Sequence, residues 1–355
     1  MAFDRRLLEA LSNARGIPGQ EDAVRSLLQE ALAPVADALH TDSLGNLFVH
    51  RTAEGQTVDP PLRVMIAAHM DEVGGMVLKV NEDGTVKFRN VGGLDPRILP
   101  GKRVRIGPQG IPGVVLVRPI HLERKDRDRV PPIQELVIDT GGAQGIRPGD
   151  MITFDTRFEP LGSLWKGKAF DDRVGCAVLA ALLQRRYPCE VVGVFTVQEE
   201  IGLRGARVAA YTVAPHVALV LEGTIADDLP KDRDASPVTQ VGRGPALSLM
   251  DRSASLDRRL VALLVETARA HGIPYQFKEP GRGGTDAGAI HLAREGVPSA
   301  VVSVPCRYIH APASLLHPQD VAHTLALMTK ALERLGQEDP RRWRTRSIHP
   351  QPPSE

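Results

Sequence analysis

Continuous runs of apolar, β-branched residues constrain this chain most, because they are typical of strands buried on both faces of a sheet. Four such runs occur, at 63–68, 190–197, 217–221 and 299–304. Stretches of helical spacing alternate with them and predict helices at 4–15, 20–34, 173–187, 203–211, 256–271, 286–294 and 318–335. A hairpin is expected over 40–51. Strands and helices in this order predict an α/β fold with a mixed, mostly parallel sheet flanked by helices.

Residues 73–164 have a different pattern of apolar residues and turn signals. Short alternating segments are separated by turn signals such as Asp83-Gly84 and Gly92-Gly93, and no long helical period interrupts them. This pattern predicts a small all-β domain inserted into the α/β domain, which then consists of residues 1–72 and 165–336. The charged stretch 123–132 is expected to be an exposed loop. Residues 337–355 are rich in Pro and Arg and are expected to form a loosely ordered tail.

The bulk composition excludes some function classes. The chain has 355 residues and a net charge of +1, so neither nucleic acid nor a membrane surface is indicated as a partner. No apolar run approaches the about 18 residues that a membrane helix needs, and the first residues lack a signal-peptide core. The sequence contains 3 cysteines and no CxxC pair, which is typical of a reducing compartment. We therefore expect a cytoplasmic protein.

Ionisable residues follow the predicted strands at the places where ligands bind in open α/β sheets, which are the carboxyl ends of the strands. His69 follows the first run, Glu199 and Glu200 follow the second, and Glu222 follows the third. His310 lies in the loop after the last run. Strands that end in this way predict one metal site at this edge of the sheet.

Each residue also has an ordinary interpretation. His69 and Asp71 form His-x-Asp, in which the carboxylate could orient a metal-binding imidazole, although both could also lie in a surface loop. The adjacent Glu199 and Glu200 repel each other unless a cation binds or one is protonated, but a solvated acidic loop is the alternative. Asp171 lies in a first helical turn, where acidic residues are common caps.

Three other groups remain open. His317 competes with His310 as the histidine of the last loop. Cys306 is near this loop, and its expected role is that of a small buried hydrophobe, with metal binding as the alternative. The glycine-rich segment 281–286 opens a predicted helix and could hold an anion there.

Taken together, the motifs resemble the glutamyl aminopeptidase and tetrahedral aminopeptidase family of metallo-aminopeptidases that use two metals. They occur in the family's order, from about residue 15 to 335. The matching stretches are Ala68-His-Met-Asp-Glu-Val-Gly74, Gly167-Lys-Ala-Phe-Asp-Asp-Arg-Val-Gly-Cys176, Phe195-Thr-Val-Gln-Glu-Glu-Ile-Gly-Leu-Arg-Gly205, Leu221-Glu-Gly-Thr224, Gly283-Gly-Thr-Asp-Ala-Gly288 and Arg307-Tyr-Ile-His-Ala-Pro312.

The resemblance implies a fold and a set of roles. The inserted domain would be a barrel or PDZ-like unit used for dimerisation. Asp171 would bridge two divalent cations, Zn or Co. His69 and Glu222 would complete the shell of one, and Glu200 and His310 that of the other. Glu199 would be the general base, and Asp71 would orient His69. Glu222 stands where many relatives have Asp, which could change the metal preference.

The function that this resemblance implies is removal of the N-terminal residue from short peptides by a homo-oligomer, a dimer or a dodecamer. Two alternatives within enzymes use the same metal core, namely a carboxypeptidase and an N-acyl-amino-acid deacylase. Some relatives have also carried a glycanase label, but no pair of acids here requires it. A non-catalytic metal-binding scaffold is the alternative from another class, although it would have no use for a base that is not a ligand.

Overall fold

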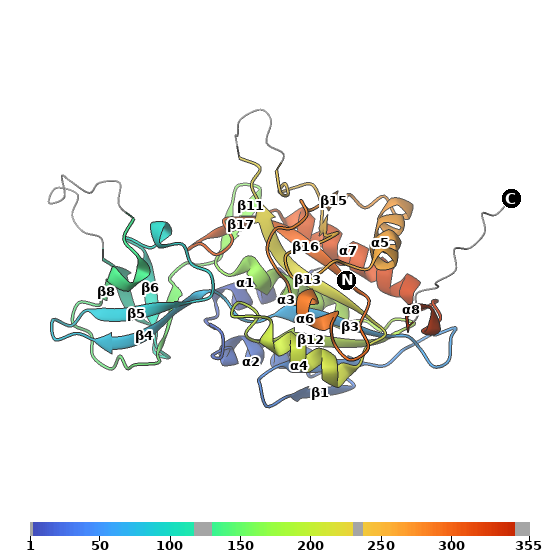
Figure 1. Ribbon diagram of the computed structural model, residues 1–355, viewed down its shortest axis with the longest axis horizontal. Helices are drawn as coiled ribbons and strands as arrows, with labels where there is room; N and C mark the ends of the chain where they lie inside the picture. Colours follow the sequence, from blue (N-terminus) through green and yellow to red (C-terminus); the bar gives the residue numbers. More distant parts are fainter. Residues whose placement is uncertain (1–2, 117–129, 230–236, 345–355) are drawn as a thin grey trace.

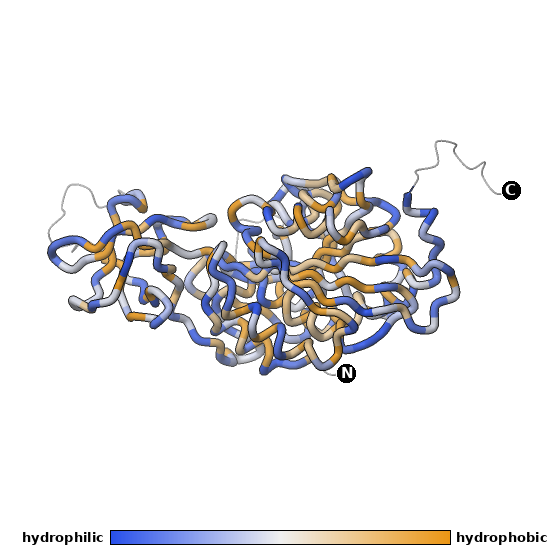
Figure 2. Tube along the Cα trace, turned by 90° about the horizontal axis from the view of Figure 1, so that it is seen from below, coloured by the Kyte–Doolittle hydropathy of each residue, from blue (hydrophilic) through white to orange (hydrophobic). Residues whose placement is uncertain are grey.

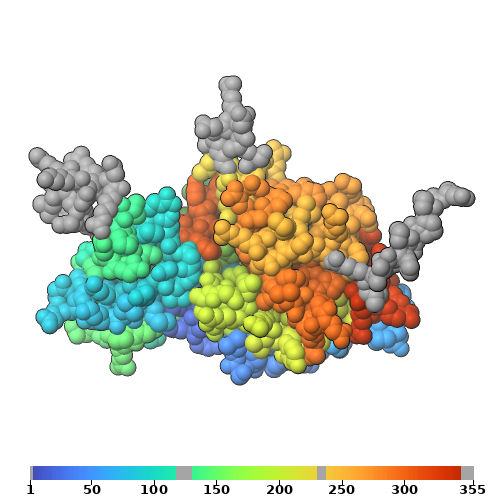
Figure 3. Space-filling model, in the orientation of Figure 1, coloured from blue at the N-terminus to red at the C-terminus, as the bar shows by residue number. Residues whose placement is uncertain are grey.

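The computed structural model of the chain describes residues 3–116, 130–229 and 237–344. Figure 1 shows a small β unit at one end of the long axis and a larger α/β unit beside it. The same two units are visible as solid bodies in Figure 3. Each has its own hydrophobic core.

The α/β unit is built on one eleven-stranded sheet. Its main path is β1 (Ala38–Thr41), β2 (Leu47–Arg51), β12 (Glu190–Thr196), β3 (Arg63–His69), β13 (Val217–Ala226), β16 (Ser299–Arg307), β17 (Ser314–Leu316), β11 (Leu164–Gly167) and β10 (Glu159–Leu161). Two short strands, β14 (Ala246–Leu247) and β15 (Gln276–Phe277), extend it beside β16. The central strands β12, β3, β13 and β16 are parallel, which confirms the predicted mixed α/β fold.

Helices cover both faces of this sheet. They are α1 (Arg5–Asn13), α2 (Asp22–Leu32), α3 (Phe170–Leu183), α4 (Arg204–Val213), α5 (Arg258–Ala270), α6 (Ala287–Ile290), α7 (Pro318–Leu335) and α8 (Arg341–Arg344). Helix α3 packs on β3 and β13 and is flanked by α1, α2 and α7, whereas α4 and α6 pack together on the sheet. After its first turn, which carries Asp171, Asp172 and Arg173, α3 is apolar all round, as expected for a helix that is covered on nearly every side. Figure 2 shows this apolar interior as parallel orange traces.

Two of the predicted elements differ most in length from those observed. The predicted helix 286–294 is a single turn, α6, and the chain leaves it with a left-handed Arg294 (φ 52°). The predicted strand 217–221 continues to Ala226, so Glu222 does not end a strand but lies within β13. The reason is register: β13 pairs with β3 only as far as Val220 and with β16 along nine residues.

The inserted unit is a closed antiparallel barrel. Its strands, in order around the barrel, are β4 (Gly74–Val80), β5 (Val86–Val91), β8 (Val137–Asp139), β7 (Ile111–Val115), β6 (Arg103–Ile106) and β9 (Met151–Phe154). Two short 3-10 turns, η1 (Pro96–Ile98) and η2 (Ile133–Glu135), accompany it. A β-carbon on Gly113 would approach Ile138 Cγ2 to 2.5 Å, so glycine permits the close packing inside.

The remaining predictions concern segments at the margins. Most of the predicted loop 123–132 lies outside the described residues, as does 345–355 of the predicted tail. The described part of the tail contains α8, whose Trp343 is buried. A search of the described helices finds none with the length and apolar character that crossing a bilayer requires.

Candidate metal centre

The centre is built around His69, the last residue of β3, which is buried. Its Nδ1 lies 3.1 Å from the backbone oxygen of Asp71. A proton on Nδ1 is donated to that carbonyl, which leaves Nε2 to face the carboxylates. Nε2 lies 3.1 Å from Asp171 Oδ1 and 3.6 Å from Glu222 Oε2. Three side chains from β3, α3 and β13 thereby enclose one half of the centre.

Asp171 connects the two halves through its two oxygens. Oδ1 faces His69, and Oδ2 lies 3.4 Å from His310 Nε2. His310 Nε2 also lies 3.1 Å from Glu200 Oε1. Its other nitrogen, Nδ1, lies 3.0 Å from the carbonyl oxygen of Gly93, a residue of the barrel. The five predicted ligands are therefore brought together, with Asp171 in the middle.

The side-chain atoms of the predicted ligands lie close enough together to hold a divalent cation. His69, Asp171 and Glu200 offer atoms within 4.8 Å of one another, and His69, Asp172 and Glu222 form a second such group. Glu222 Oε1 and Glu200 Oε1 are buried and make no hydrogen bond with described residues, although Glu200 Oε1 lies beside His310. Imidazoles with carboxylates are a donor set that Zn²⁺ and Co²⁺ accept.

Burial and the closeness of other charged groups shift the pKa values of these side chains strongly. Burial raises the pKa of Glu222 to about 8. Burial works against a charged His310, but Asp171 and Glu200 outweigh it and raise the pKa of the imidazole to about 11. Burial, helped by Glu222 and Asp286, raises the pKa of Glu199 well above its usual value. Glu222 and His310, which are proposed ligands, would have to release their protons when a cation binds.

Asp172 is a residue that the sequence did not identify. Its Oδ2 accepts the backbone N–H of His69 at 3.2 Å, and its Oδ1 accepts that of Gly175 at 2.9 Å. A carboxylate in the first turn of α3 looks like an ordinary cap in sequence, and only the contact with β3 distinguishes it.

Glu199 and Asp71 lie beside the ligands. Glu199 Oε2 is 3.9 Å from His69 Nε2, farther than the carboxylates of Asp171 and Glu222. The carboxylate of Asp71 is 3.5 Å from His69 Nδ1. Its oxygens also accept the backbone N–H groups of Glu199 (3.1 Å) and Glu200 (3.0 Å). Asp71 therefore contacts both the imidazole and the backbone that carries the two glutamates.

Two buried charged residues adjoin the centre. Asp286, from the glycine-rich segment, bonds Thr196 Oγ1 at 2.5 Å, and burial raises its pKa to about 6. Its Oδ1 is buried and without a partner among the described residues. Lys278, after β15, is 5% exposed, and burial lowers its pKa against the opposing fields of Glu222, Asp251 and Asp171. In sequence Lys278 stands between Phe277 and Glu279, and this context gives no sign of its proximity to the centre.

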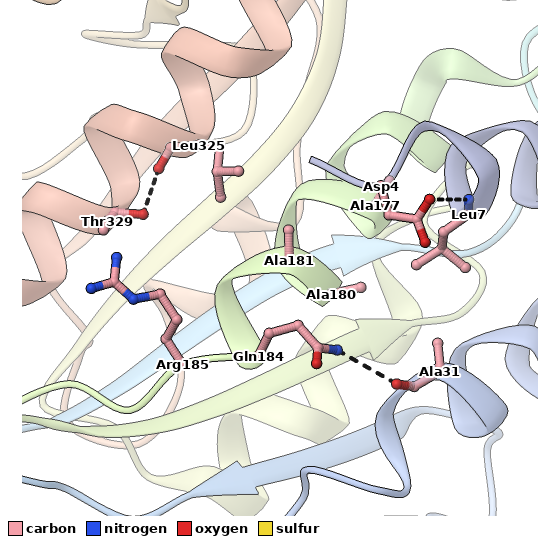
Figure 4. Close-up of a pocket in the computed structure, with 10 residues that line it drawn as sticks. All are labelled: Asp4, Leu7, Ala31, Ala177, Ala180, Ala181, Gln184, Arg185, Leu325 and Thr329. Atoms are coloured by element: carbon pink, nitrogen blue, oxygen red, sulfur yellow. Dashed lines mark hydrogen bonds between the residues drawn. The ribbon is translucent and has the colours of Figure 1, made fainter. Parts of the chain in front are cut away.

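A pocket elsewhere in the molecule offers no comparable chemistry. Figure 4 shows it between α1, α2, α3 and α7. Its volume is about 390 Å³. Its lining is rich in alanine, and its one acidic residue, Asp4, caps α1. The pocket contains no histidine, so we exclude it as the catalytic site.

Comparisons with known proteins agree with this geometry. The family model of the M42 glutamyl aminopeptidases matches residues 45–327. A lysyl aminopeptidase of Pyrococcus furiosus is 32% identical over 95% of this chain and 99% of its own. The crystal structure of a TET aminopeptidase from a marine sediment Thaumarchaeota archaeon superposes with a TM-score of 0.87 at 34% identity, covering 93% of this chain and 96% of its own. The TET1 peptidase of Pyrococcus horikoshii, which can assemble into a tetrahedron or a large octahedral shell, gives 0.81 at 29% identity, covering 92% and 98%.

Proposed function

The chain belongs to the M42 glutamyl aminopeptidase family, and from this premise we propose that it removes the N-terminal residue from short peptides with two divalent cations, Zn or Co. The observation that supports the proposal most is the placement of Asp171 between the two histidines. The proposed ligands are His69, Asp171, Glu200, Glu222 and His310.

Each group in the centre has a proposed role in peptide hydrolysis. Two bound cations would acidify a water and polarise the scissile carbonyl. Glu199, whose pKa is raised by burial, takes the proton from that water at its carboxylate and passes it to the departing amine nitrogen. Asp71 fixes the backbone of Glu199 and contacts the His69 ring, as a group that orients others should.

The Glu199→Gln variant tests this assignment. Gln has the same shape but cannot take a proton, so we expect kcat to fall by roughly 10²–10⁴-fold while cation binding is retained. Hydrolysis of aminoacyl-p-nitroanilides with added Co²⁺ or Zn²⁺ measures the activity, and metal analysis measures the content. Full metal content with near-normal turnover would refute Glu199 as the base.

A panel of unblocked aminoacyl substrates, N-acylated substrates and peptides with a free C-terminus would separate the alternative activities. Family members with a free α-amino requirement would cleave unblocked aminoacyl substrates only. Cleavage that requires a free C-terminal carboxylate would indicate a carboxypeptidase, and cleavage of N-acyl amino acids a deacylase. A chain that binds cations and cleaves nothing would be a scaffold.

Within this function, we propose that the substrate's first residue is acidic. The family carries the name glutamyl and a relative the name lysyl, so this fold accepts either charge. In this chain Lys278 is buried, and no described residue forms a hydrogen bond or ion pair with its ammonium. Once cations take up the charge of Asp171 and Glu222, this ammonium is left to attract an anionic group of the substrate.

Lys278→Met tests the preference. It removes the charge and keeps much of the apolar length, so kcat/KM for Glu-p-nitroanilide should fall by at least about tenfold, the equivalent of ~1.4 kcal/mol. The value for Leu-p-nitroanilide should stay the same or rise. Equal losses on both substrates would show that Lys278 supports the fold and does not select the substrate.

We also propose that the chain forms a homo-oligomer through its barrel. The relative from Pyrococcus horikoshii forms closed shells. The barrel of this chain exposes Leu78 and Val80 of β4 and Val114 of β7, with 47%, 42% and 42% of their surfaces accessible. Leu78 and Val80 lie two residues apart on β4 and are the apolar side chains that we propose for the association surface, whereas Val114 lies on β7, which does not pair with β4.

A further inference from the structure

The loop after β12 is held by side chains at four consecutive backbone amides. None of these amides extends the β12–β3 pairing, which ends at Thr196. The bonds are Val197 N–H to Asn46 Oδ1 (3.1 Å), Gln198 N–H to Glu21 Oε1 (3.2 Å), Glu199 N–H to Asp71 Oδ1 (3.1 Å) and Glu200 N–H to Asp71 Oδ2 (3.0 Å). The two glutamates of the centre thus stand on backbone that side chains from distant segments hold in place.

Gln198 is the residue in this loop that most needs support. Its φ of 58° is left-handed, a conformation that is unfavourable for any residue with a β-carbon. The turn it makes directs Glu199 and Glu200 away from the line of the strand and toward the ligands. The side chain that binds its amide is Glu21.

The buried carboxylate of Glu21 binds backbone amides of two loops. It directly precedes α2, but its carboxylate makes no capping bond to that helix. The same oxygen, Oε1, accepts Gly19 N–H at 2.7 Å and Gln198 N–H at 3.2 Å. The side chain is only 3% exposed, so water does not replace these donors easily. Burial of a carboxylate is unfavourable unless its hydrogen bonds are satisfied, and here they join two loops.

We propose that Glu21 is a positioning residue, which sets the orientation of Glu199 and Glu200 through the backbone amide of Gln198. Among the described residues, its carboxylate bonds to the amides of Gly19 and Gln198 and to none of the proposed ligand side chains. The inference rests on the proposed function, because it assumes that Glu199 is the base and Glu200 a ligand. Groups that orient ligands or bases from outside the centre typically change affinity or activity by roughly 10–100-fold when removed.

The test compares Glu21→Ala with Glu21→Gln. Loss of the carboxylate should lower kcat at saturating Co²⁺ by about 10–100-fold, with KM within about threefold. The amide oxygen of Gln can accept both N–H groups, so Glu21→Gln should restore most of the activity. Co²⁺ affinity, measured from the visible absorption of the bound ion, should fall in the Ala variant and recover in the Gln variant.

Asp320→Ala is the matched control. Asp320 is also buried, and it also holds two loop amides, those of Gly242 (2.6 Å) and Gly244 (2.7 Å), but at the start of α7. Its loss should lower the unfolding midpoint while kcat and Co²⁺ affinity persist below that midpoint. Glu21→Asp, whose arm is one methylene shorter, serves if the Ala variant does not fold, and should show an intermediate loss.

Two results would overturn the proposal. One is a Glu21→Ala or Glu21→Asp chain whose kcat and Co²⁺ affinity match those of Asp320→Ala. The other is Glu21→Gln losing as much as Glu21→Ala, which would assign the effect to charge and not to the acceptor. A wild-type chain that binds Co²⁺ and cleaves no peptide would refute the proposed function, whereas the affinity comparison would still test Glu21.

Discussion

Single residues in the centre have protonation states that only their surroundings explain. Burial raises the pKa of Glu222 to about 8, and the carboxylates around His310 raise its pKa to about 11 in spite of burial. At pH 7 both groups therefore hold a proton in the metal-free chain. A cation that binds to them must displace those protons, since ligands bind metals in their deprotonated forms.

Cation binding should therefore release protons and strengthen with pH. Both pKa values lie above 7, so raising the pH from 6 to 8 lowers the cost of deprotonation, and the apparent Co²⁺ affinity should rise at least about tenfold. Calorimetry at pH 7 in two buffers of different ionisation enthalpy would count the protons. A Co²⁺ affinity that does not change between pH 6 and 8 would contradict this expectation.

At the scale of elements, a buried ionic network joins the start of the chain to the centre. Glu72, just after β3, accepts from Lys168 Nζ at 2.6 Å and from Arg173 Nη2 at 3.3 Å. Arg173 is completely buried in α3 and also donates to the carbonyls of Leu11 and Gly16. The network thereby ties α1, β3 and α3 together directly behind His69 and Asp171.

Glu72→Ala should be strongly destabilising. The variant leaves the buried, positively charged side chains of Lys168 and Arg173 without their carboxylate partner. A loss of this kind typically costs about 3–5 kcal/mol of unfolding free energy. Urea unfolding of the metal-free chain measures the effect. Glu159→Ala removes the exposed partner of Lys166 and should cost below about 1 kcal/mol. A similar cost in both variants would mean that the network contributes little.

The parallel core, and His69, Glu199 and Glu200 at its edge, could be predicted because strand periodicity and strand ends can be read locally, whereas the ligand role of Asp171 came from the family resemblance. The sequence did not predict how far β13 extends, since that depends on its pairing with β16 beyond the end of β3. The shortness of α6 and the roles of Glu21 and Asp172 were also missed. These features depend on contacts between segments far apart in the chain, for which a single sequence carries no periodic signal.

At the scale of the whole molecule, the barrel and the α/β unit have separate cores, so each can serve a different purpose. We assign catalysis to the larger unit and association to the barrel. Leu78→Glu places a charge on the exposed apolar face of β4 and should reduce the oligomer mass measured by light scattering. Leu292→Glu, at a residue of the α/β unit that is 72% exposed, is the control and should leave the mass unchanged. Equal masses for all three chains would place the interface elsewhere.

Several hydrogen bonds cross the boundary between these units, such as those from Arg15 to the carbonyls of Gly107 and Pro108, and one contact across it reaches the centre. Nδ1 of the His310 imidazole lies 3.0 Å from the carbonyl oxygen of Gly93, which belongs to the barrel unit. A twist of the barrel relative to the sheet would therefore turn the ring and, in the proposed two-cation centre, change the binding of the cation at His310 and not of the one at His69. In the proposed oligomer, a force that a neighbouring subunit exerts on the barrel would therefore be transmitted through Gly93 to the imidazole of His310.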